Sequence, residues 1–126
     1  MGNIVNGPSS GEKFVGNIWW PSKANIKFRN FVSLAQWADS TGQEKWNGFV
    51  VGKEIDPLLK GPLSTRLADT HQLQSLHQFQ LQPNSPITDQ GFDLKKLLHV
   101  PYAGHDFYNN KVPQGKGVEP GIYERN

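Results

Sequence analysis

The chain has 126 residues, a length that suits a single domain around one hydrophobic core. Its formal net charge of +2, without any basic run, lacks the charge pattern of a nucleic-acid-binding protein, and no apolar stretch is long enough to span a bilayer. The absence of cysteine excludes disulfides, thiolate metal ligands and a cysteine nucleophile.

Composition divides the chain into three parts that together make one expected domain. Residues 1–13 are polar and rich in Gly, Ser and Pro, which is typical of a flexible entry segment. Residues 14–82 carry most of the apolar clusters and are predicted to form a β-rich core. Residues 83–126 are rich in turn-forming residues and are predicted to form a C-terminal cap.

The predicted elements of the core are short. An apolar and aromatic run predicts a strand over 14–20, and a second strand is predicted over 46–51, with a bend at Gly48. Between them, Ser33 as N-cap and Gly42 as terminator predict a helix over 33–41.

The end of the core and the start of the cap hold two further predicted elements. Alternation with a period of two predicts a strand over 77–82, and Asp93 is predicted to cap a helical turn over 93–98. We therefore expect a mainly β fold with one or two short helices and a long irregular C-terminal arm. Whether the strands pair in parallel or antiparallel fashion stays open at this point.

Three motifs occur in fixed order near the C-terminus. They are Phe79-x-Leu81-x-Pro83-x-Ser85-Pro86-x-x-Asp89-x-Gly91, then Asp106-Phe107-Tyr108-Asn109 with Val112-Pro113, then Gly121-Ile122-Tyr123-Glu124. This order resembles the C-terminal signature of secreted bacterial right-handed parallel β-helix proteins of the polysaccharide lyase and pectate lyase type. Asn17-Ile18-Trp19-Trp20, the helix start at 33–37 and Asp56-Pro57 resemble the last coils of the same family.

The resemblance implies an end-of-solenoid β module whose C-terminal arm closes the last coil. It implies upstream β-helix coils of a parent chain as the partner, polysaccharide as a further partner, and a secreted, periplasmic or cell-surface location. The first residues, 1–6, lack the features of an export signal, so the chain is either cytoplasmic or exported through a signal that lies upstream. Neither a nucleic acid nor a membrane is expected as a partner.

Structural roles are expected for the motif residues, because a solenoid end must be covered to avoid an open, pairing-prone edge. We expect a tight corner at 84–86, backbone N–H groups bound by Asp89, and a positive φ at Gly91. Phe107, Tyr108, Ile122 and Tyr123 are expected to anchor the arm onto an apolar surface. The full structural set is Ser85, Pro86, Asp89, Gly91, Asp106, Phe107, Gly121, Tyr123 and Glu124.

The tryptophans are the candidate sugar-binding residues, since flat aromatic rings pack against the apolar faces of sugars. Trp46 lies among polar neighbours and is the leading candidate for an exposed ring. Trp19 and Trp20 are adjacent, so in a strand they face opposite sides and core packing is the favoured interpretation for them. Trp37 lies on the apolar face of the predicted helix and is expected in the core.

No catalytic residue, metal site or cofactor is predicted. The four histidines, at positions 71, 77, 99 and 105, lack the spacing of metal ligands, and the carboxylates occupy turn or capping contexts. The leading hypothesis is a non-catalytic C-terminal capping module of a carbohydrate-active β-helix protein. The alternatives are an independent carbohydrate-binding module and, less favoured, a small polysaccharide lyase or glycosidase.

Overall fold

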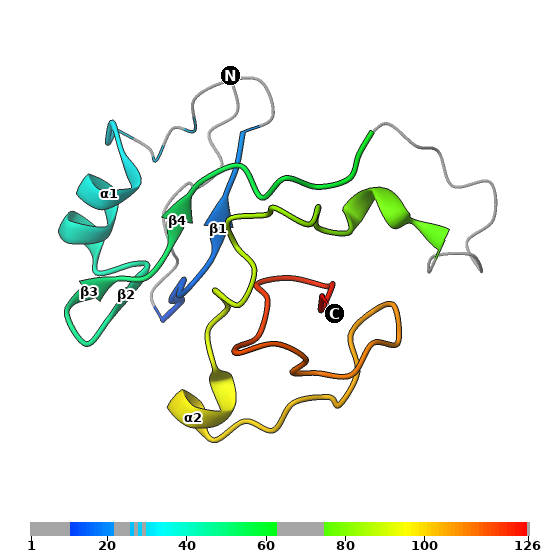
Figure 1. Ribbon diagram of the computed structural model, residues 1–126. Coiled ribbons are helices and arrows are strands. Elements are labelled where there is room, and N and C mark those ends of the chain that lie inside the picture. Colours follow the sequence, from blue (N-terminus) through cyan, green and yellow to red (C-terminus); the bar gives the residue numbers. More distant parts are fainter. Residues whose placement is uncertain (1–10, 22–25, 27, 29, 63–74, 126) are drawn as a thin grey trace. The chain divides into compact units, whose positions relative to one another are not determined.

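The computed structural model of the protein describes residues 11–21, 26, 28, 30–62 and 75–125 (Figure 1). The chain divides into two compact units, residues 1–56 and residues 57–126. The described strands are two residues long and form two separate two-stranded sheets, and the described helices are few and short. This is a fold of short strands in small sheets, and no repeated solenoid coil occurs among the described residues. Most of the predicted entry segment lies outside them.

The first unit contains a parallel strand pair. Strand β1 (Ile18–Trp19) pairs with β4 (Lys53–Glu54), with Ile18 opposite Lys53 and Trp19 opposite Glu54. Parallel neighbours need a long crossover connection, and here the intervening chain supplies a helix and a hairpin (Figure 1).

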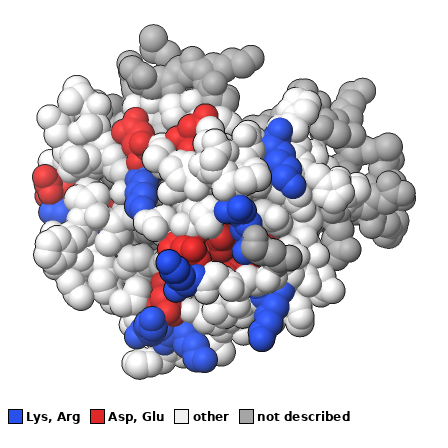
Figure 2. Space-filling model, viewed as in Figure 1, with Lys and Arg blue, Asp and Glu red and all other residues white. Residues whose placement is uncertain are grey.

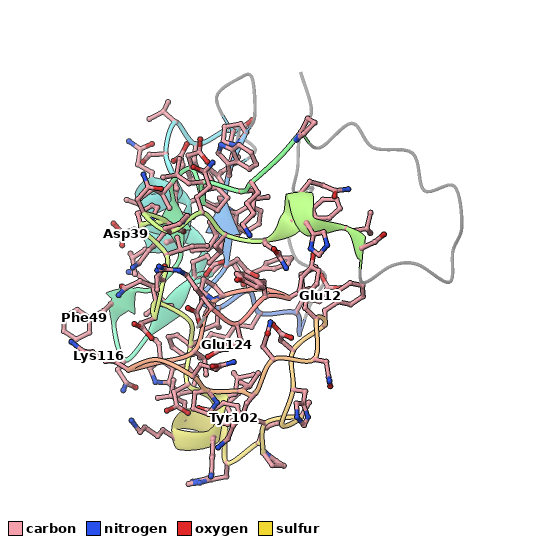
Figure 3. All side chains as sticks on the ribbon, turned by 45° about the vertical axis from the view of Figure 1, so that its right-hand side comes forward. Glu12, Asp39, Phe49, Tyr102, Lys116 and Glu124 are labelled. Atoms are coloured by element: carbon pink, nitrogen blue, oxygen red, sulfur yellow. The ribbon has the colours of Figure 1, made fainter. Side chains whose placement is uncertain are left out.

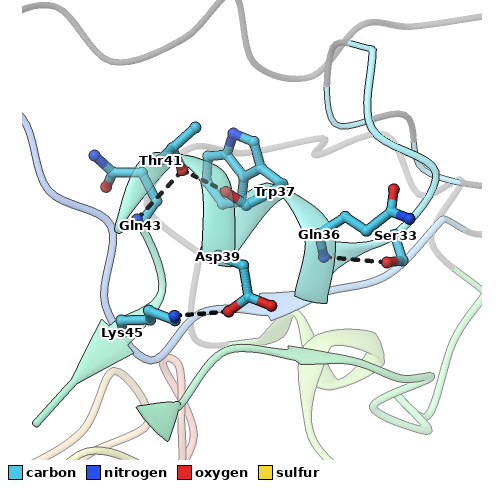
Figure 4. A network of polar contacts seen from close by, with 7 residues as sticks. All are labelled: Ser33, Gln36, Trp37, Asp39, Thr41, Gln43 and Lys45. Atoms are coloured by element: carbon cyan, nitrogen blue, oxygen red, sulfur yellow. Dashed lines mark hydrogen bonds and ion pairs between the residues drawn. The ribbon is translucent and has the colours of Figure 1, made fainter. Parts of the chain in front are cut away.

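Helix α1 (Leu34–Thr41) matches the helix predicted over 33–41, because both of its ends carry local signals. The Ser33 hydroxyl accepts the Gln36 N–H at 3.2 Å, which satisfies one of the free donors of the first turn (Figure 4). Gly42 adopts a φ of 72° and donates its N–H to the Ala38 carbonyl. The helix is therefore bounded as the sequence predicts.

The C-terminal end of α1 is tied to the segment that follows it (Figure 4). The Thr41 hydroxyl donates to the Trp37 carbonyl at 2.6 Å and accepts the Gln43 N–H at 3.3 Å. Lys45 and Asp39 form an ion pair at 2.6 Å. Exposed pairs of this kind contribute little stability, so the hydroxyl contacts are the more important of the two.

The core of the first unit is aromatic. Trp37 is fully buried, as predicted, and stacks on Phe28 with ring centroids 5.3 Å apart, while Trp19 meets both rings edge-on. Such rings bury large apolar areas and prefer these stacked and T-shaped arrangements. The cluster consists of Ile26, Phe28, Leu34 and Trp37, with Phe14, Trp19 and Phe31 packed against it.

The strand predicted over 46–51 is wrong in its extent, since these residues form a hairpin. Strand β2 (Lys45–Trp46) pairs antiparallel with β3 (Phe49–Val50). Asn47 and Gly48 both have positive φ, at 48° and 83°, which is the geometry of a two-residue hairpin turn. The Asn-Gly turn therefore decides the local structure, although the apolar run favours one continuous strand. The first unit thus contains both a parallel and an antiparallel strand pair.

The strand predicted over 14–20 is reduced to Ile18–Trp19. Gly16 has a φ of 74°, which interrupts extended backbone, and the N–H groups of Phe14 and Asn17 are bound by side chains and not by a strand. Side-chain acceptors thus replace the ladder that the apolar pattern predicts.

The strand predicted over 77–82 is also wrong. Residues His77–Phe79 form a short 3-10 helix, η2, and Leu81 makes an isolated bridge with Leu59. The Gln80 N–H returns to the His77 carbonyl, so local turn bonds replace a ladder.

The second unit has little regular structure. Helix α2 (Leu94–Leu98) begins at Asp93, whose carboxylate accepts the Lys96 N–H at 3.0 Å, which confirms the predicted cap. From residue 101 to residue 125 the chain contains turns, bends, one isolated bridge between His105 and Lys111, and irregular segments, with no helix or strand. The described helices of both units are too short and too polar to cross a bilayer. Buried side chains of the unit include Leu81, Ile87 and Val118.

Glu44 is the polar centre of the first unit. Its carboxylate is fully buried and accepts the Asn17 N–H at 3.1 Å, the Asn17 side-chain amide at 2.6 Å and the Trp19 indole N–H at 3.0 Å. Its own backbone bonds the Phe14 carbonyl and the Val51 N–H. One residue thereby connects the segments before β1 and β4.

We predict that Glu44→Gln destabilises the protein by about 1–3 kcal/mol, because a carboxamide presents donor hydrogens to groups that are themselves donors. Urea unfolding monitored by tryptophan fluorescence measures the change. Glu54→Gln, an exposed residue in β4, is the matched control and should leave the unfolding midpoint unchanged. Equal midpoints for the two variants would contradict the central role of Glu44.

Candidate functional site

The predicted motif residues of the second unit meet in a network of carboxylates and backbone amides. Asp106 is its first member. One oxygen accepts the N–H groups of Tyr108 and Asn110, both at 2.8 Å, and the other accepts the Asn110 side chain at 2.8 Å and the Glu124 N–H at 2.6 Å. Although burial opposes ionisation, these donors hold the pKa of Asp106 below its ordinary value. Asp106 is a turn residue, as predicted.

Glu124 extends this network. Asp106 binds its backbone, and its own side chain is buried, with 4% of the residue exposed (Figure 3). The carboxylate accepts the Gln114 N–H at 2.9 Å and the Glu119 N–H at 3.3 Å. Glu124 therefore holds a loop over residues 114–119 in place.

Asp89 binds the same loop from the other motif. Its carboxylate accepts the Gly117 N–H at 2.9 Å, as predicted for a residue that binds backbone amides. Gly115 and Gly117 pack so closely on Asp89 that a Cβ at either position would collide with it. Sequence reasoning missed this pair of glycines, whose only signal is their Gly-x-Gly spacing.

The corner motif confirms one expectation and corrects another. The predicted corner is confirmed, because the Ser85 N–H donates to the Gln82 carbonyl at 3.1 Å and the Thr88 N–H donates to the Ser85 carbonyl at 3.4 Å. The buried Ser85 hydroxyl also donates to the Pro57 carbonyl at 2.7 Å. The positive φ expected at Gly91 is wrong, because Gly91 is not among the residues with positive φ. The glycine is needed instead for close approach, since a Cβ there would lie 2.6 Å from the Val118 carbonyl oxygen. Gly121 does adopt a positive φ, of 123°.

Glu119 differs from the other carboxylates of this network. Only 7% of the residue is exposed, and neither carboxylate oxygen has a hydrogen-bond partner in the described part of the chain. Burial, reinforced by the negative charges of Glu124 and Asp89, raises the pKa of Glu119 to about 7. Its sequence context, before a proline and a glycine, indicates only a turn.

Aromatic side chains form a cluster beside the network. Tyr108 meets Phe107 and Tyr123 edge-on, with centroids 5.1 and 5.6 Å apart, and its hydroxyl donates to the Leu76 carbonyl at 2.7 Å. Phe107 is 36% exposed and Ile122 is 50% exposed. They form an apolar surface of the second unit, and their contact with a sheet stays a prediction.

The tryptophans singled out in the sequence have different environments. Trp19 packs in the aromatic core of the first unit, and Trp20 is half-buried. Trp46 is half-buried in the hairpin, with Lys13 Nζ 5.6 Å from its ring centroid. The most exposed ring of this hairpin is Phe49, which is paired with Trp46 across the turn and is 76% exposed (Figure 3). Sequence reasoning missed Phe49, although the Asn-Gly turn places it opposite Trp46.

The charges of the described surface are mixed in sign. On the face drawn in Figure 2, lysine and arginine side chains are dispersed and acidic side chains lie among them. Within the described ranges, no group of three or more His, Asp or Glu side chains has an arrangement that could hold a metal ion. The carboxylates of Asp89, Asp106 and Glu124 form a scaffold that binds backbone amides.

We predict that Asp106→Asn destabilises the second unit by about 1–3 kcal/mol, because an amide replaces one of two acceptor oxygens that each serve two donors. Because folding lowers the pKa of Asp106, its contribution to stability is complete above pH 3.8, the ordinary pKa of the group. This contribution is lost as pH falls through the lowered pKa. The variant should therefore lose part of the acid-side fall in the thermal midpoint. Asp39→Asn, an exposed control, should retain the wild-type profile, and an unchanged Asp106→Asn profile would contradict the assignment.

Comparison with known proteins adds nothing to this geometry. No protein-family model, curated protein or solved structure matches the chain.

Proposed function

We propose that the chain is a non-catalytic C-terminal capping module of a secreted, carbohydrate-active parallel β-helix protein. The observation that carries the proposal is the parallel pair β1–β4, because among the described residues no further strand pairs with the outer edge of β1. A chain that continues a parallel solenoid needs such an edge to receive the preceding coil.

The hydrogen bonds of this pair identify the backbone groups at the open edge. The Asn17 carbonyl accepts the Lys53 N–H at 3.0 Å, and the Trp19 carbonyl accepts the Ile55 N–H at 3.2 Å. Because alternate residues of a parallel strand use the same ladder, the N–H and C=O of Ile18 face away from β4. These are the groups that a strand of an upstream coil would bind.

The second unit has the properties expected of a cover. Its carboxylates at Asp89, Asp106 and Glu124 bind backbone N–H groups within the unit, so its irregular backbone is satisfied without a long open strand. Because both oxygens of Asp106 and of Glu124 already have donors, these carboxylates favour a structural role over acid–base chemistry on a glycan. The resemblance of motif order supports the glycan-degrading context and the secreted location.

A fusion experiment tests the capping role. The chain is joined to a parallel β-helix polysaccharide lyase from which the last coil and its cover have been removed. We expect the fusion to be monomeric and to regain a higher thermal midpoint than the truncated lyase, because open edges promote association. Size-exclusion chromatography and thermal unfolding give the readouts.

Two substitutions at one position make this test specific. Ile18→Pro removes the N–H that faces away from β4, so it should leave unfolding of the isolated chain nearly unchanged but abolish rescue in the fusion. Ile18→Ala removes the side chain and keeps the N–H, so it should still rescue. Rescue by the proline variant, or a failure of the wild-type chain to rescue, would refute the proposal.

A second function, carbohydrate binding, is favoured by the hairpin pair of Trp46 and Phe49. Phe49 offers an exposed ring next to an indole, which suits stacking on a sugar face. Titration of tryptophan fluorescence with uronate-containing and neutral oligosaccharides would detect binding. A saturable change that Phe49→Ala abolishes and Val32→Ala, an exposed control, retains would support this function, whereas no response would leave capping as the sole proposal.

A further inference from the structure

Two carboxyl groups of the second unit, Glu119 and Glu124, are buried near one another, so their negative charges repel when both are ionised. We propose that Glu119 and Glu124 share a proton that keeps the loop at residues 114–119 closed, and that loss of this proton as pH rises loosens the loop. The inference concerns the second unit itself and does not depend on the capping role.

Their surroundings assign different states to the two groups. Glu124 has backbone donors at both oxygens, Gln114 N–H at 2.9 Å and Glu119 N–H at 3.3 Å. Glu119 is also buried, but both of its oxygens lack partners among the described residues. A buried carboxylate without donors is costly, whereas a protonated one can donate to its neighbour. The proton therefore belongs mainly on Glu119.

The charges that face Glu119 act in the same direction. Burial is the largest cause that raises its pKa to about 7, followed by repulsion from Glu124, the hydrogen bond that its protonated form donates to Glu124, and repulsion from Asp89. The Arg125 backbone N–H makes no hydrogen bond of ordinary length and angle to Glu119, and its opposing effect on the Glu119 pKa is the smallest of these. The two ion pairs identified in the described ranges, Lys45–Asp39 and Lys96–Asp93, involve neither Glu119 nor Glu124.

Ionisation of Glu119 acts on the atoms that hold the loop. The Glu124 oxygen that accepts the Glu119 N–H would then lie against a second negative charge, in a site with little water. Asp89 binds Gly117 in the same loop and adds a third negative group. Movement of the loop away from these carboxylates relieves the repulsion, so the loop amides should open.

The raised pKa determines the direction of the pH dependence. The Glu119 carboxyl group has a pKa of about 7 in the folded protein and an ordinary pKa of 4.5, so its protonated form contributes its full stabilisation below pH 4.5. Its contribution is lost as pH rises from about 4.5 to about 7. Closing of the loop should therefore weaken across this window and stay weak above it.

Amide hydrogen exchange, measured by NMR on the full chain, tests the inference. Protection factors, which are corrected for the intrinsic pH dependence of exchange, are compared at pH 5 and pH 8. We expect the amides of Gln114, Gly117 and Glu119 to lose protection at least about tenfold, since one pKa unit corresponds to a tenfold change. The Gly42 amide, in the first unit, is the internal reference and should not change.

Two variants test whether the Glu119 proton causes this loss of protection. Glu119→Gln keeps the shape and cannot ionise, so its loop protection should be the same at both pH values. Glu54→Gln, exposed in β4, should retain the wild-type loss. A wild-type-like loss in Glu119→Gln would overturn the proposal, as would a Glu119 side-chain carbon resonance that titrates near pH 4.5 in the wild-type protein.

A bound cation would also stabilise a buried carboxylate without donors, and it has a distinct signature. If added Ca²⁺ restored loop protection at pH 8 in the wild-type chain but not in Glu119→Gln, a cation bridge would replace the shared proton. If Ca²⁺ and a chelator both have no effect, the shared proton stands.

Discussion

The structure depends on one constraint, which is that buried backbone N–H groups need acceptors even where the chain forms almost no regular secondary structure. Helices and sheets normally supply those acceptors. Here the described strands are two residues long, so side-chain carboxylates take over much of this role. Glu44 does so in the first unit, and Asp106 and Glu124 do so in the second.

These carboxylates also explain why the units tolerate so many turns. A charged acceptor makes a stronger hydrogen bond than a neutral carbonyl and can bind several donors, so one residue fixes several segments. Asp106 connects the turn at residues 108–110 to Glu124, which in turn fixes the loop at 114–119. Loss of one carboxylate therefore affects more than its own turn.

The same arrangement bears on function. Carboxylates whose oxygens already bind backbone donors are poor candidates for proton transfer to a substrate, and this favours a structural module over a glycan-cleaving one. Glu119 is the exception, because it is buried near two other carboxylates and neither of its oxygens has a hydrogen-bond partner within the described ranges. Glu119 is buried among the contacts that hold the loop at residues 114–119. We therefore connect it with the stability of the C-terminal arm and not with an exposed reaction site.

The elements with local signals could be predicted from the sequence. Ser33 and Gly42 bound α1, and Asp93 begins α2, because caps act within a few residues and need no distant partner. The Asn47-Gly48 turn carried an equally local signal that an apolar run obscured. The roles of Asp89 and Asp106 as acceptors for backbone N–H groups were also predictable, since turn carboxylates have few other uses.

The remaining features required the tertiary structure. The alternating pattern at 77–82 could not show that Leu81 would find only a single bridge, because strand pairing depends on a distant partner. The sequence indicated that position 91 requires glycine, but it gave the wrong reason. The structure shows that a side chain there would collide with the Val118 carbonyl, whereas φ is not positive. The sequence by itself thus determined the helix caps and the acceptor roles of Asp89 and Asp106, whereas the tertiary structure decided the strand limits and the burial of Glu44 and Glu119. Burial and pairing depend on residues far away in the chain, and a local pattern does not contain them.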